Sequence, residues 1–355
     1  MKKYFFVSNT YYSGKTSVIL GLASNLVENG KKVGYFKPWS ILSEKNEEGL
    51  LIDPNLELIK KVLGLSNPIT DLYGIELVPN YLTEFAKKPK DAIKKIILEK
   101  IDKLTKENFD YFFIEGHGSP YFGMFIEVSH EILIQHVDAT PIIIAGIDKY
   151  NKDDVLDSIL ATKDLLKTEK EILCIINKLP SDFSTEFSKT LQEELKRNKI
   201  RSIGLIPESK ILAYPTVRDV FRRLQGQVII EPDDTNGMNL IQEFLIGAME
   251  VENALTYFRR LPSKAVITGG DRSDLVLAAI ETDTVLMILS GTKYPESKVL
   301  SSLRRKNVPT LLIPYDTHTV IKQLDSITWL TPPDNDMKIN EAKKLIKENI
   351  KGDIF

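Results

Sequence analysis

In the first part of the chain, short apolar runs alternate with segments in which apolar residues recur at helical spacing. An apolar run at residues 4–7 is followed by a helical pattern at 15–28 that ends near Gly30, and then by a second apolar run at 32–37. Later apolar runs predict strands at 111–114, 141–145, 172–176 and 202–206, and the segments between them predict helices at 55–63, 90–106, 152–167 and 184–196. This alternation indicates an α/β domain whose mostly parallel sheet has helices on both faces.

A polar, turn-rich stretch then separates this domain from a second, smaller α/β pattern. The second pattern predicts strands at 265–268, 285–289 and 310–313, and helices at 240–260, 273–281 and 297–306. A charged segment at 340–351 predicts a peripheral helix. The resulting domain prediction is a first domain over 1–228, a linker over 229–237, a second domain over 238–332 and a C-terminal tail or helix over 333–355.

Composition narrows the class of protein. Lys and Arg number 47 and Asp and Glu 49, so the net charge of −2 argues against a broad surface for nucleic acid or anionic membrane. The longest apolar stretches, such as Pro141 to Ile147, are too short to span a membrane, and the run after the basic start is too short for a signal peptide. The single cysteine, Cys174, excludes an internal disulfide and reads as a buried small hydrophobe. We therefore expect a cytoplasmic protein with neither nucleic-acid nor membrane partners.

The clearest chemical motif is the segment Ser8–Ser17, which lies between a predicted strand and an amphipathic helix. This is the context of a phosphate-binding P-loop, in which backbone N–H groups surround phosphate oxygens at a helix N-terminus. Lys15 would reach the β- and γ-phosphates, and the Thr16 hydroxyl would bind Mg²⁺. The first glycine of the motif is replaced by Asn9, and the alternative is a Ser-Gly turn before an ordinary helix. The nucleotide-binding residues predicted in this segment are Asn9, Ser13, Gly14, Lys15, Thr16 and Ser17.

Polar residues at the carboxyl ends of other predicted strands point to the same crevice. Glu115 ends an apolar strand and would hold Mg²⁺ directly or through water, or else face solvent. Lys37 ends the second strand, where it would clamp a phosphate or carboxylate as a catalytic group, or remain solvated. Asp53 precedes a helix and is either its N-cap or a second carboxylate for the metal. Asn177 would read adenine through its amide or simply form a turn, and His117 is best explained as a loop histidine.

These motifs together resemble the dethiobiotin synthetase-like group of P-loop proteins. The matching segments are Ser13–Thr16, Tyr35–Pro38, Ile114–Gly116 and Ile176–Asn177. The resemblance implies that the loop binds ATP, that Asp53 and Glu115 serve Mg²⁺, and that Lys37 faces the substrate. The chain departs from the group at Asn9 and in having Glu-Gly-His-Gly-Ser at 115–119 where the group has Glu-Gly-Ala-Gly-Gly.

Downstream segments look like the N-terminal region of long phosphate acetyltransferases. These segments are Ile203–Glu208, Tyr214–Val217, Ile246–Met249 and Ile267–Asp274. The last one resembles a DRTGG domain, with a later Thr-Gly-Gly replaced by Ser-Gly-Thr at 290–292. In those acetyltransferases this combination forms the non-catalytic, regulatory half. Because the chain ends near where the acetyl-transfer domain would begin, acetyltransferase activity is not expected.

The DRTGG segment also has a direct physical interpretation. Two glycines follow a predicted strand, and Asp271 to Ser273 opens the next helix, so the turn is suited to an anion. Arg272 would bind phosphate or pair across a dimer interface, or else form a structural pair with an aspartate at a tight turn. The predicted ligand or dimer site of this domain comprises Gly270, Asp271 and Arg272.

These observations support one leading function and two alternatives. The leading one is a nucleotide-binding regulatory or sensor protein that takes ATP and Mg²⁺ in its first domain, and whose DRTGG domain forms a homodimer or higher homo-oligomer or senses a second ligand. The two domains would communicate through the helix predicted at 240–260. The first alternative is an ATP-dependent ligase or synthetase that acts on a carboxylate or amine, or a slow ATPase. The second is an assembly partner of a separate acetyltransferase or another enzyme.

Overall fold

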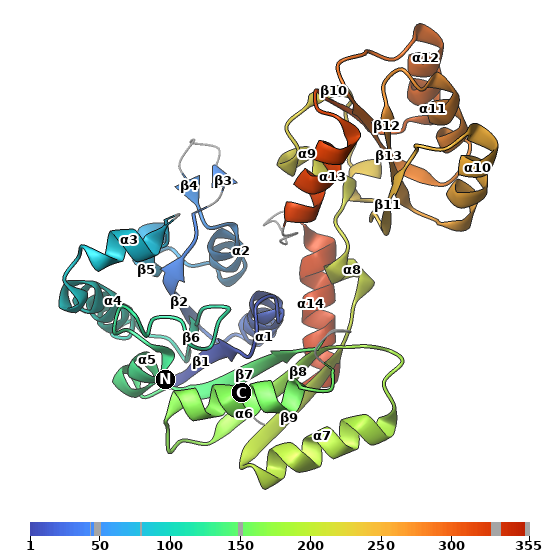
Figure 1. Ribbon diagram of the computed structural model, residues 1–355. Helices are drawn as coiled ribbons and strands as arrows, with labels where there is room; N and C mark the ends of the chain where they lie inside the picture. The colour runs from blue at the N-terminus through green and yellow to red at the C-terminus, as the bar shows by residue number, and fades with distance from the viewer. Residues whose placement is uncertain (43, 46–50, 79, 148–151, 328–334, 352–355) are drawn as a thin grey trace. The chain divides into compact units, whose positions relative to one another are not determined.

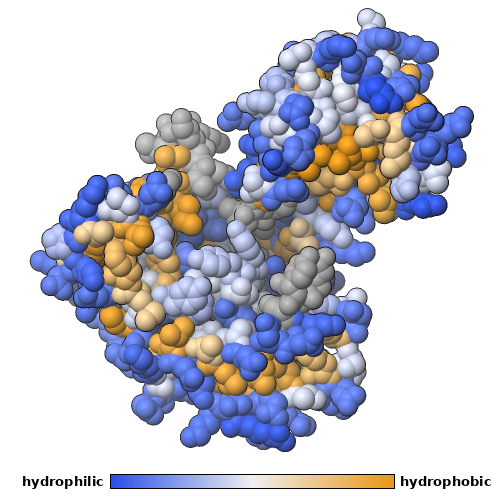
Figure 2. Space-filling view, in the orientation of Figure 1, coloured by the Kyte–Doolittle hydropathy of each residue, from blue (hydrophilic) through white to orange (hydrophobic). Residues whose placement is uncertain are grey.

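The computed structural model describes residues 1–42, 44–45, 51–78, 80–147, 152–327 and 335–351. The chain divides into two compact units, one containing Met1–Ser209 with Thr331–Phe355 and the other containing Lys210–Leu330 (Figure 1). Each unit is built on one main sheet with helices, which confirms the predicted α/β class. Hydrophilic residues cover most of the visible faces, and apolar residues are grouped in a few patches (Figure 2).

The first unit contains a seven-stranded sheet in the order β5-β2-β6-β1-β7-β8-β9, in which every neighbouring pair is parallel. Its strands are β1 (Lys2–Ser8), β2 (Val33–Ser40), β5 (Tyr73–Glu76), β6 (Tyr111–Glu115), β7 (Thr140–Gly146), β8 (Ile172–Leu179) and β9 (Ile200–Pro207). A separate short ladder joins β3 (Glu44–Lys45) to β4 (Leu51–Ile52). The central strands read as nearly continuous apolar runs because helices bury both of their faces.

Two helical layers cover this sheet. One layer contains α1 (Lys15–Glu28), α2 (Pro54–Leu63) and α14 (Asp336–Asn349). The other contains α4 (Lys90–Leu104), α5 (His130–Val137), α6 (Val155–Leu166) and α7 (Thr185–Arg197), while α3 (Tyr81–Ala86) precedes α4. A short 3₁₀ helix spans Ile69–Asp71.

The strand order changes direction at β1, and this positions the candidate site. The chain leaves β1 for β2 on one side, whereas β7, β8 and β9 extend the sheet on the other side. At such a switch point the two flanking connections diverge, which leaves a crevice at the carboxyl end of the strand. The P-loop segment occupies that end of β1, before α1.

The second unit has a five-stranded sheet in the order β10-β14-β13-β12-β11. Only the pair β10–β14 is antiparallel. Its strands are β10 (Gln227–Ile230), β11 (Glu243–Ile246), β12 (Lys264–Gly269), β13 (Thr284–Ser290) and β14 (Thr310–Ile313). Its helices are α8 (Lys210–Ala213), α9 (Val217–Arg223), α10 (Val251–Arg260), α11 (Ser273–Ile280), α12 (Ser297–Lys306) and α13 (Thr317–Ser326), with a 3₁₀ turn at Asn236–Met238.

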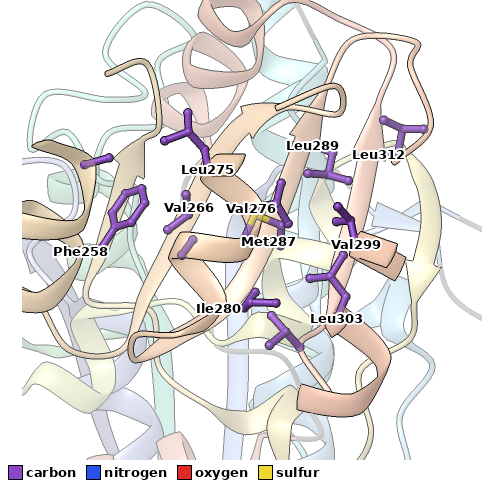
Figure 3. Close-up of a cluster of buried hydrophobic side chains, with 13 residues drawn as sticks. Phe258, Val266, Leu275, Val276, Ile280, Met287, Leu289, Val299, Leu303 and Leu312 are labelled. Atoms are coloured by element: carbon purple, nitrogen blue, oxygen red, sulfur yellow. The ribbon is translucent and has the colours of Figure 1, made fainter. Parts of the chain in front are cut away.

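Alternate residues of these strands face two separate cores. Val266, Met287 and Leu289 pack with Phe258, Leu275 and other residues of α10, α11 and α12 (Figure 3). Their strand neighbours Ala265, Leu286 and Ile288 pack instead against α9 and α13. The period of two along each strand therefore explains why the sheet needs helices on both faces.

Three predicted segments differ from the structure. The helix predicted at 240–260 is wrong: Glu243–Ile246 forms the edge strand β11, and only Val251–Arg260 is helical. The short apolar run at 244–246 fits the period of a helix as well as that of a strand, and pairing with β12 makes it a strand. The continuous helix that was expected to link the two domains is therefore not formed at 240–260. The predicted linker at 229–237 begins inside β10, which pairs with β14.

The predicted peripheral helix near the C-terminus is instead packed into the first unit. Helix α14 buries Ile339, Ala342 and Ile346, and Ile350 bridges to Gly204 at the edge of the sheet. Helix α14 approaches α1 closely at Gly21, where a Cβ atom would lie 2.5 Å from the Ala342 carbonyl oxygen. Only a residue without a side chain permits this approach.

We predict that Gly21→Ala destabilises the first unit by about 1–3 kcal/mol, because the added methyl overpacks the contact with α14. In an unobstructed helix the same substitution stabilises by about 1 kcal/mol, so the sign of the change is diagnostic. Urea unfolding followed by circular dichroism measures it. Lys189→Ala on the exposed face of α7 is the control and should change the unfolding free energy by less than about 0.5 kcal/mol. A stabilised Gly21→Ala variant would contradict the tight packing.

Candidate functional site

The loop between β1 and α1 is shaped for close approach of an anion. Tyr12 and Gly14 have positive φ angles of 57° and 83°, and no side chain caps the N-terminus of α1. A Cβ atom on Gly14 would lie 2.2 Å from the Asn177 side-chain nitrogen, so glycine is required there. The uncapped N–H groups at the start of α1 are the groups that bind phosphate in a P-loop.

Asn9 occupies its position without the left-handed backbone that a glycine would allow. Its Oδ1 accepts a hydrogen bond from the Gly146 N–H at 3.2 Å, and its Nδ2 donates to Ser158 Oγ at 2.8 Å. Asn9 is not among the described residues with positive φ. Its side chain therefore ties the loop to the end of β7 and to α6.

Asn177, at the carboxyl end of β8, also holds the loop. Its Nδ2 donates to the Ser13 carbonyl oxygen at 2.8 Å, and Ser13 Oγ donates to Ser8 Oγ at 2.8 Å. One of the amide donors that we expected to read adenine is thus used to position the loop. Ser17 lies in the first turn of α1.

Lys15 is buried at the base of this loop. Its side chain lies 3.4 Å from Ser8 Oγ, and the residue is 7% exposed. Burial lowers the pKa of Lys15 to about 8; Glu115 opposes this shift and Lys37 adds to it. A bound anion would stabilise the charged ammonium, so the site favours a negatively charged ligand.

The buried carboxylate of Glu115 joins β6 to α1 and β2. Thr16 Oγ1 donates to Glu115 Oε1 at 2.7 Å, and the Tyr35 hydroxyl donates to Oε2 at 2.6 Å. Burial, followed by the Glu115 charge, raises the pKa of Tyr35 well above its usual value, so Tyr35 remains a donor. The hydroxyl and carboxylate oxygens beside the loop are hard ligands of the kind that Mg²⁺ prefers.

Lys37 and Asp53 form an ion pair on the same side of the sheet. The Lys37 ammonium and the Ser40 hydroxyl donate to Asp53 Oδ2 at 2.5 Å and 2.7 Å, while Oδ1 accepts from the first backbone N–H groups of α2. Burial opposes the charge of Lys37, but the Asp53 and Glu115 carboxylates outweigh burial and raise the pKa of Lys37. Asp53 is therefore the N-cap of α2, and its carboxylate is already engaged by cationic and polar donors.

Two histidines beside Glu115 form a hydrogen-bonded network. His117 Nδ1 accepts from the Ser119 N–H at 3.2 Å, and His130 Nε2 accepts from the His117 N–H at 3.1 Å. The His117 ring stacks on Phe122, with 3.8 Å between the ring centroids. Burial, with smaller effects of neighbouring cations, lowers the pKa of His117 to about 3; burial, partly opposed by the bond to the Pro120 carbonyl, lowers that of His130 to about 4.

Sequence reasoning assigned no role to His130, Tyr35 or Trp39. His130 begins a helix and Trp39 lies in an apolar strand, so neither belongs to a motif, and Tyr35 begins the motif at Tyr35–Pro38 in which only Lys37 was singled out. The contacts of Tyr35 with Glu115 and of Trp39 with His130 depend on segments distant in the sequence being brought together.

The DRTGG turn of the second unit is a set of local ion pairs. Asp271 pairs with Lys293 at 2.8 Å, and Arg272 contacts Asp274 and the Met249 carbonyl oxygen. A Cβ atom on Gly270 would lie 2.0 Å from the Lys293 carbonyl oxygen, so the turn packs tightly against the loop after β13. The predicted residues Gly270, Asp271 and Arg272 thus lie together, with their charges paired.

Two further properties hold for the described part of the chain. It contains no group of three or more His, Cys, Asp or Glu residues arranged to hold a metal ion. None of its helices combines the length and apolarity required to cross a membrane.

The fold and this loop define a P-loop protein of the α/β class. A family model for an AAA domain matches residues 2–216, and a DRTGG-domain model matches residues 219–327. The chain belongs to this AAA-domain family and carries a DRTGG domain, and the predicted combination of the two is confirmed.

The chain is also similar to known phosphate acetyltransferases. It is 25% identical over 356 residues to the one from Nitratidesulfovibrio vulgaris, covering 95% of this chain and 49% of the relative. It is 22% identical over 382 residues to the one from Nitrosomonas europaea, covering 99% of this chain and 51% of the relative. The chain therefore spans about half the length of these curated relatives, which confirms the resemblance to their N-terminal region.

The chain is similar to the solved structure of the CBS and DRTGG domains of the regulatory region of Clostridium perfringens pyrophosphatase. It is 16% identical, has a TM-score of 0.29, and the match covers 47% of this chain and 86% of that chain. MinD of Aquifex aeolicus is 18% identical with a TM-score of 0.32, over 60% of this chain and 84% of that chain.

We predict that Asn9→Gly destabilises the loop by about 1–3 kcal/mol, although glycine is the usual P-loop residue there. The substitution removes the Oδ1 that accepts from the Gly146 N–H and the Nδ2 that donates to Ser158. Thr10→Gly is the matched control, since it adds the same backbone freedom and breaks no hydrogen bond of the Asn9 side chain. Urea unfolding and hydrogen exchange at the Gly146 amide measure the effect. Equal losses in the two variants would show that the Asn9 side chain is not the tie.

We also predict that His130 remains neutral down to about pH 4. Its pKa is depressed from 6.5 in the folded state, so the stability it contributes is complete above pH 6.5 and is lost as the pH falls toward 4. Across that window the free energy of unfolding falls by about 3 kcal/mol. An NMR titration of the histidine ring protons tests this prediction, with His318→Gln to aid assignment. A midpoint near 6.5 for His130 would show that its ring is not desolvated.

Proposed function

We propose that this chain is a nucleotide-binding regulatory module that takes ATP with Mg²⁺ at the P-loop. The observation that carries the proposal is the Thr16–Glu115 hydrogen bond beside buried Lys15, at the uncapped start of α1. This arrangement supplies one cation and open N–H groups for phosphates, and two oxygen ligands for a metal. Thr16 and Glu115 would hold Mg²⁺, which would supply charge neutralisation between the phosphates.

The similarity to the N-terminal half of phosphate acetyltransferases supports a regulatory role for the chain. In this proposal the DRTGG unit binds a second ligand or forms a homodimer or higher homo-oligomer through Asp271 and Arg272. A separate acetyltransferase is the proposed partner, and a cytoplasmic location follows from that role. Asp53 is assigned to holding Lys37 and α2, with at most an indirect part in the metal site.

Calorimetric titration of the full chain with ATP tests this proposal, with and without Mg²⁺. We expect micromolar binding by the natural chain and a loss of about 10- to 100-fold in Lys15→Ala, because a charge-assisted hydrogen bond contributes about 1.5–3 kcal/mol. Glu115→Gln should retain ATP affinity without metal but lose the gain that Mg²⁺ provides. Lys189→Ala on α7 is the matched control. A folded chain that binds ATP in neither condition would overturn the proposal.

A second function, ATP-dependent ligation, is favoured by one observation. Lys37, kept protonated by Asp53 and Glu115, lies on the side of Glu115 away from β1, where a substrate carboxylate would be phosphorylated. An assay of ADP release with added carboxylates and amines separates the two functions. Release that depends on such a substrate would identify a ligase, whereas binding without release would support the regulatory role.

A further inference from the structure

An unusual concentration of rings lies beside the P-loop, on the side of β1 occupied by β6 and β2. Rings from five separate segments contribute to it, and we refer to these residues as the aromatic cluster. Its members are Tyr11, Trp39, Tyr81, His117, Phe122 and His130.

The cluster is one connected set of ring contacts. His117 stacks on Phe122 at 3.8 Å, and the Tyr11 ring stands edge-on to His117 at 5.6 Å. Phe122 also contacts Trp39 at 5.2 Å and Tyr81 at 5.6 Å. Because Tyr11 belongs to the P-loop itself, the cluster begins at the phosphate site and extends away from it.

The outer part of the cluster is exposed although it is aromatic. Tyr11 is 52% exposed, Tyr81 38% and the neighbouring Tyr121 61%. The phenols of Tyr121 and Tyr81 lie close enough to Tyr11 to add to the effect of burial in raising its pKa. Exposed aromatic residues that gather around a polar site are typical of a surface that binds a ligand or partner.

The inner part of the cluster presents hydrogen-bond donors without acceptors. Because His117 Nδ1 accepts from the Ser119 N–H, the proton of the neutral ring lies on Nε2, and no described residue accepts from it. The Trp39 Nε1–H is buried and also has no partner among the described residues. Of these two donors, only the His117 Nε2–H is open to a ligand acceptor, because His117 is partly exposed whereas the Trp39 nitrogen has no accessible surface.

Position separates this feature from the nucleotide site. Asn177 and β8 lie on one side of β1, whereas β6, β2 and their rings lie on the other. We propose that the aromatic cluster binds a second small ligand that has a planar aromatic ring bearing a carbonyl or ring-nitrogen acceptor. The ring stacks among Tyr11, Tyr81 and Tyr121, and the acceptor accepts a hydrogen bond from the His117 Nε2–H. The proposal extends the proposed function at its neighbouring site, but ring binding itself does not require Lys15.

Ligand-observed NMR by saturation transfer tests the proposal, using benzamide and its saturated counterpart cyclohexanecarboxamide as probes. The full chain is examined with and without ATP and Mg²⁺. We expect saturation transfer to benzamide and none to cyclohexanecarboxamide, because only the flat ring stacks. Tyr121→Leu should weaken benzamide binding about two- to tenfold, as expected for loss of one ring contact. Tyr257→Leu, an exposed tyrosine of α10 in the second unit, is the matched control and should have no effect.

Each other outcome has a definite meaning. Equal binding of the two amides, no binding of either, or equal effects of Tyr121→Leu and Tyr257→Leu would overturn the proposal. A change in sedimentation coefficient in Tyr121→Leu, without benzamide binding, would show that the aromatic face contacts protein instead. Benzamide binding in a chain that fails to bind ATP would support the ring site while rejecting the proposed nucleotide function.

Discussion

The burial of one carboxylate, Glu115 at the end of β6, organises the candidate site. A buried carboxylate is strongly destabilising unless donors and cations surround it. Thr16 and Tyr35 supply the hydrogen bonds, and Lys15 and Lys37 supply positive charge nearby. The two lysines then diverge: Lys37 has Asp53 as a close partner and its pKa is raised, whereas Lys15 has no described carboxylate in hydrogen-bond contact and its pKa is lowered. Lys15 is therefore the cation of this group with which an incoming anion would pair.

Close packing holds the phosphate loop in place before any ligand arrives. Asn9 ties its start to β7 and α6, and Asn177 ties its end to β8. Gly146 and Gly14 permit these approaches, because a Cβ on Gly146 would lie 2.7 Å from Ser13 Cα. A loop positioned in this way would bind an anion with little reorganisation, because its N–H groups are already fixed in place. Asn9 thus has a structural role at the position of the motif's first glycine.

Much of this architecture was predictable, and the failures have a common cause. The strands of the first unit and the P-loop follow from strong local periodicity and from a motif within one continuous segment. The strand β11 was missed because a run of three apolar residues at an edge has no distinctive period, and pairing with β12 decides its state. Asn177 was expected either to read adenine or to form a turn, and the sequence did not reveal that its amide also supports the loop, a contact between residues 164 positions apart.

The sequence by itself determined the α/β class, the order of the two domains and the residues Lys15, Thr16 and Glu115, because each follows from local patterns. Only the tertiary structure decided that Tyr35 and Thr16 share one carboxylate, that Asp53 holds Lys37, and that α14 returns to pack on α1. It also decided that Tyr11, Trp39 and Phe122 belong to one aromatic cluster. The physical reason is that hydrogen bonds and ring contacts depend on distances between strands, and the order of strands in a sheet differs from their order along the chain.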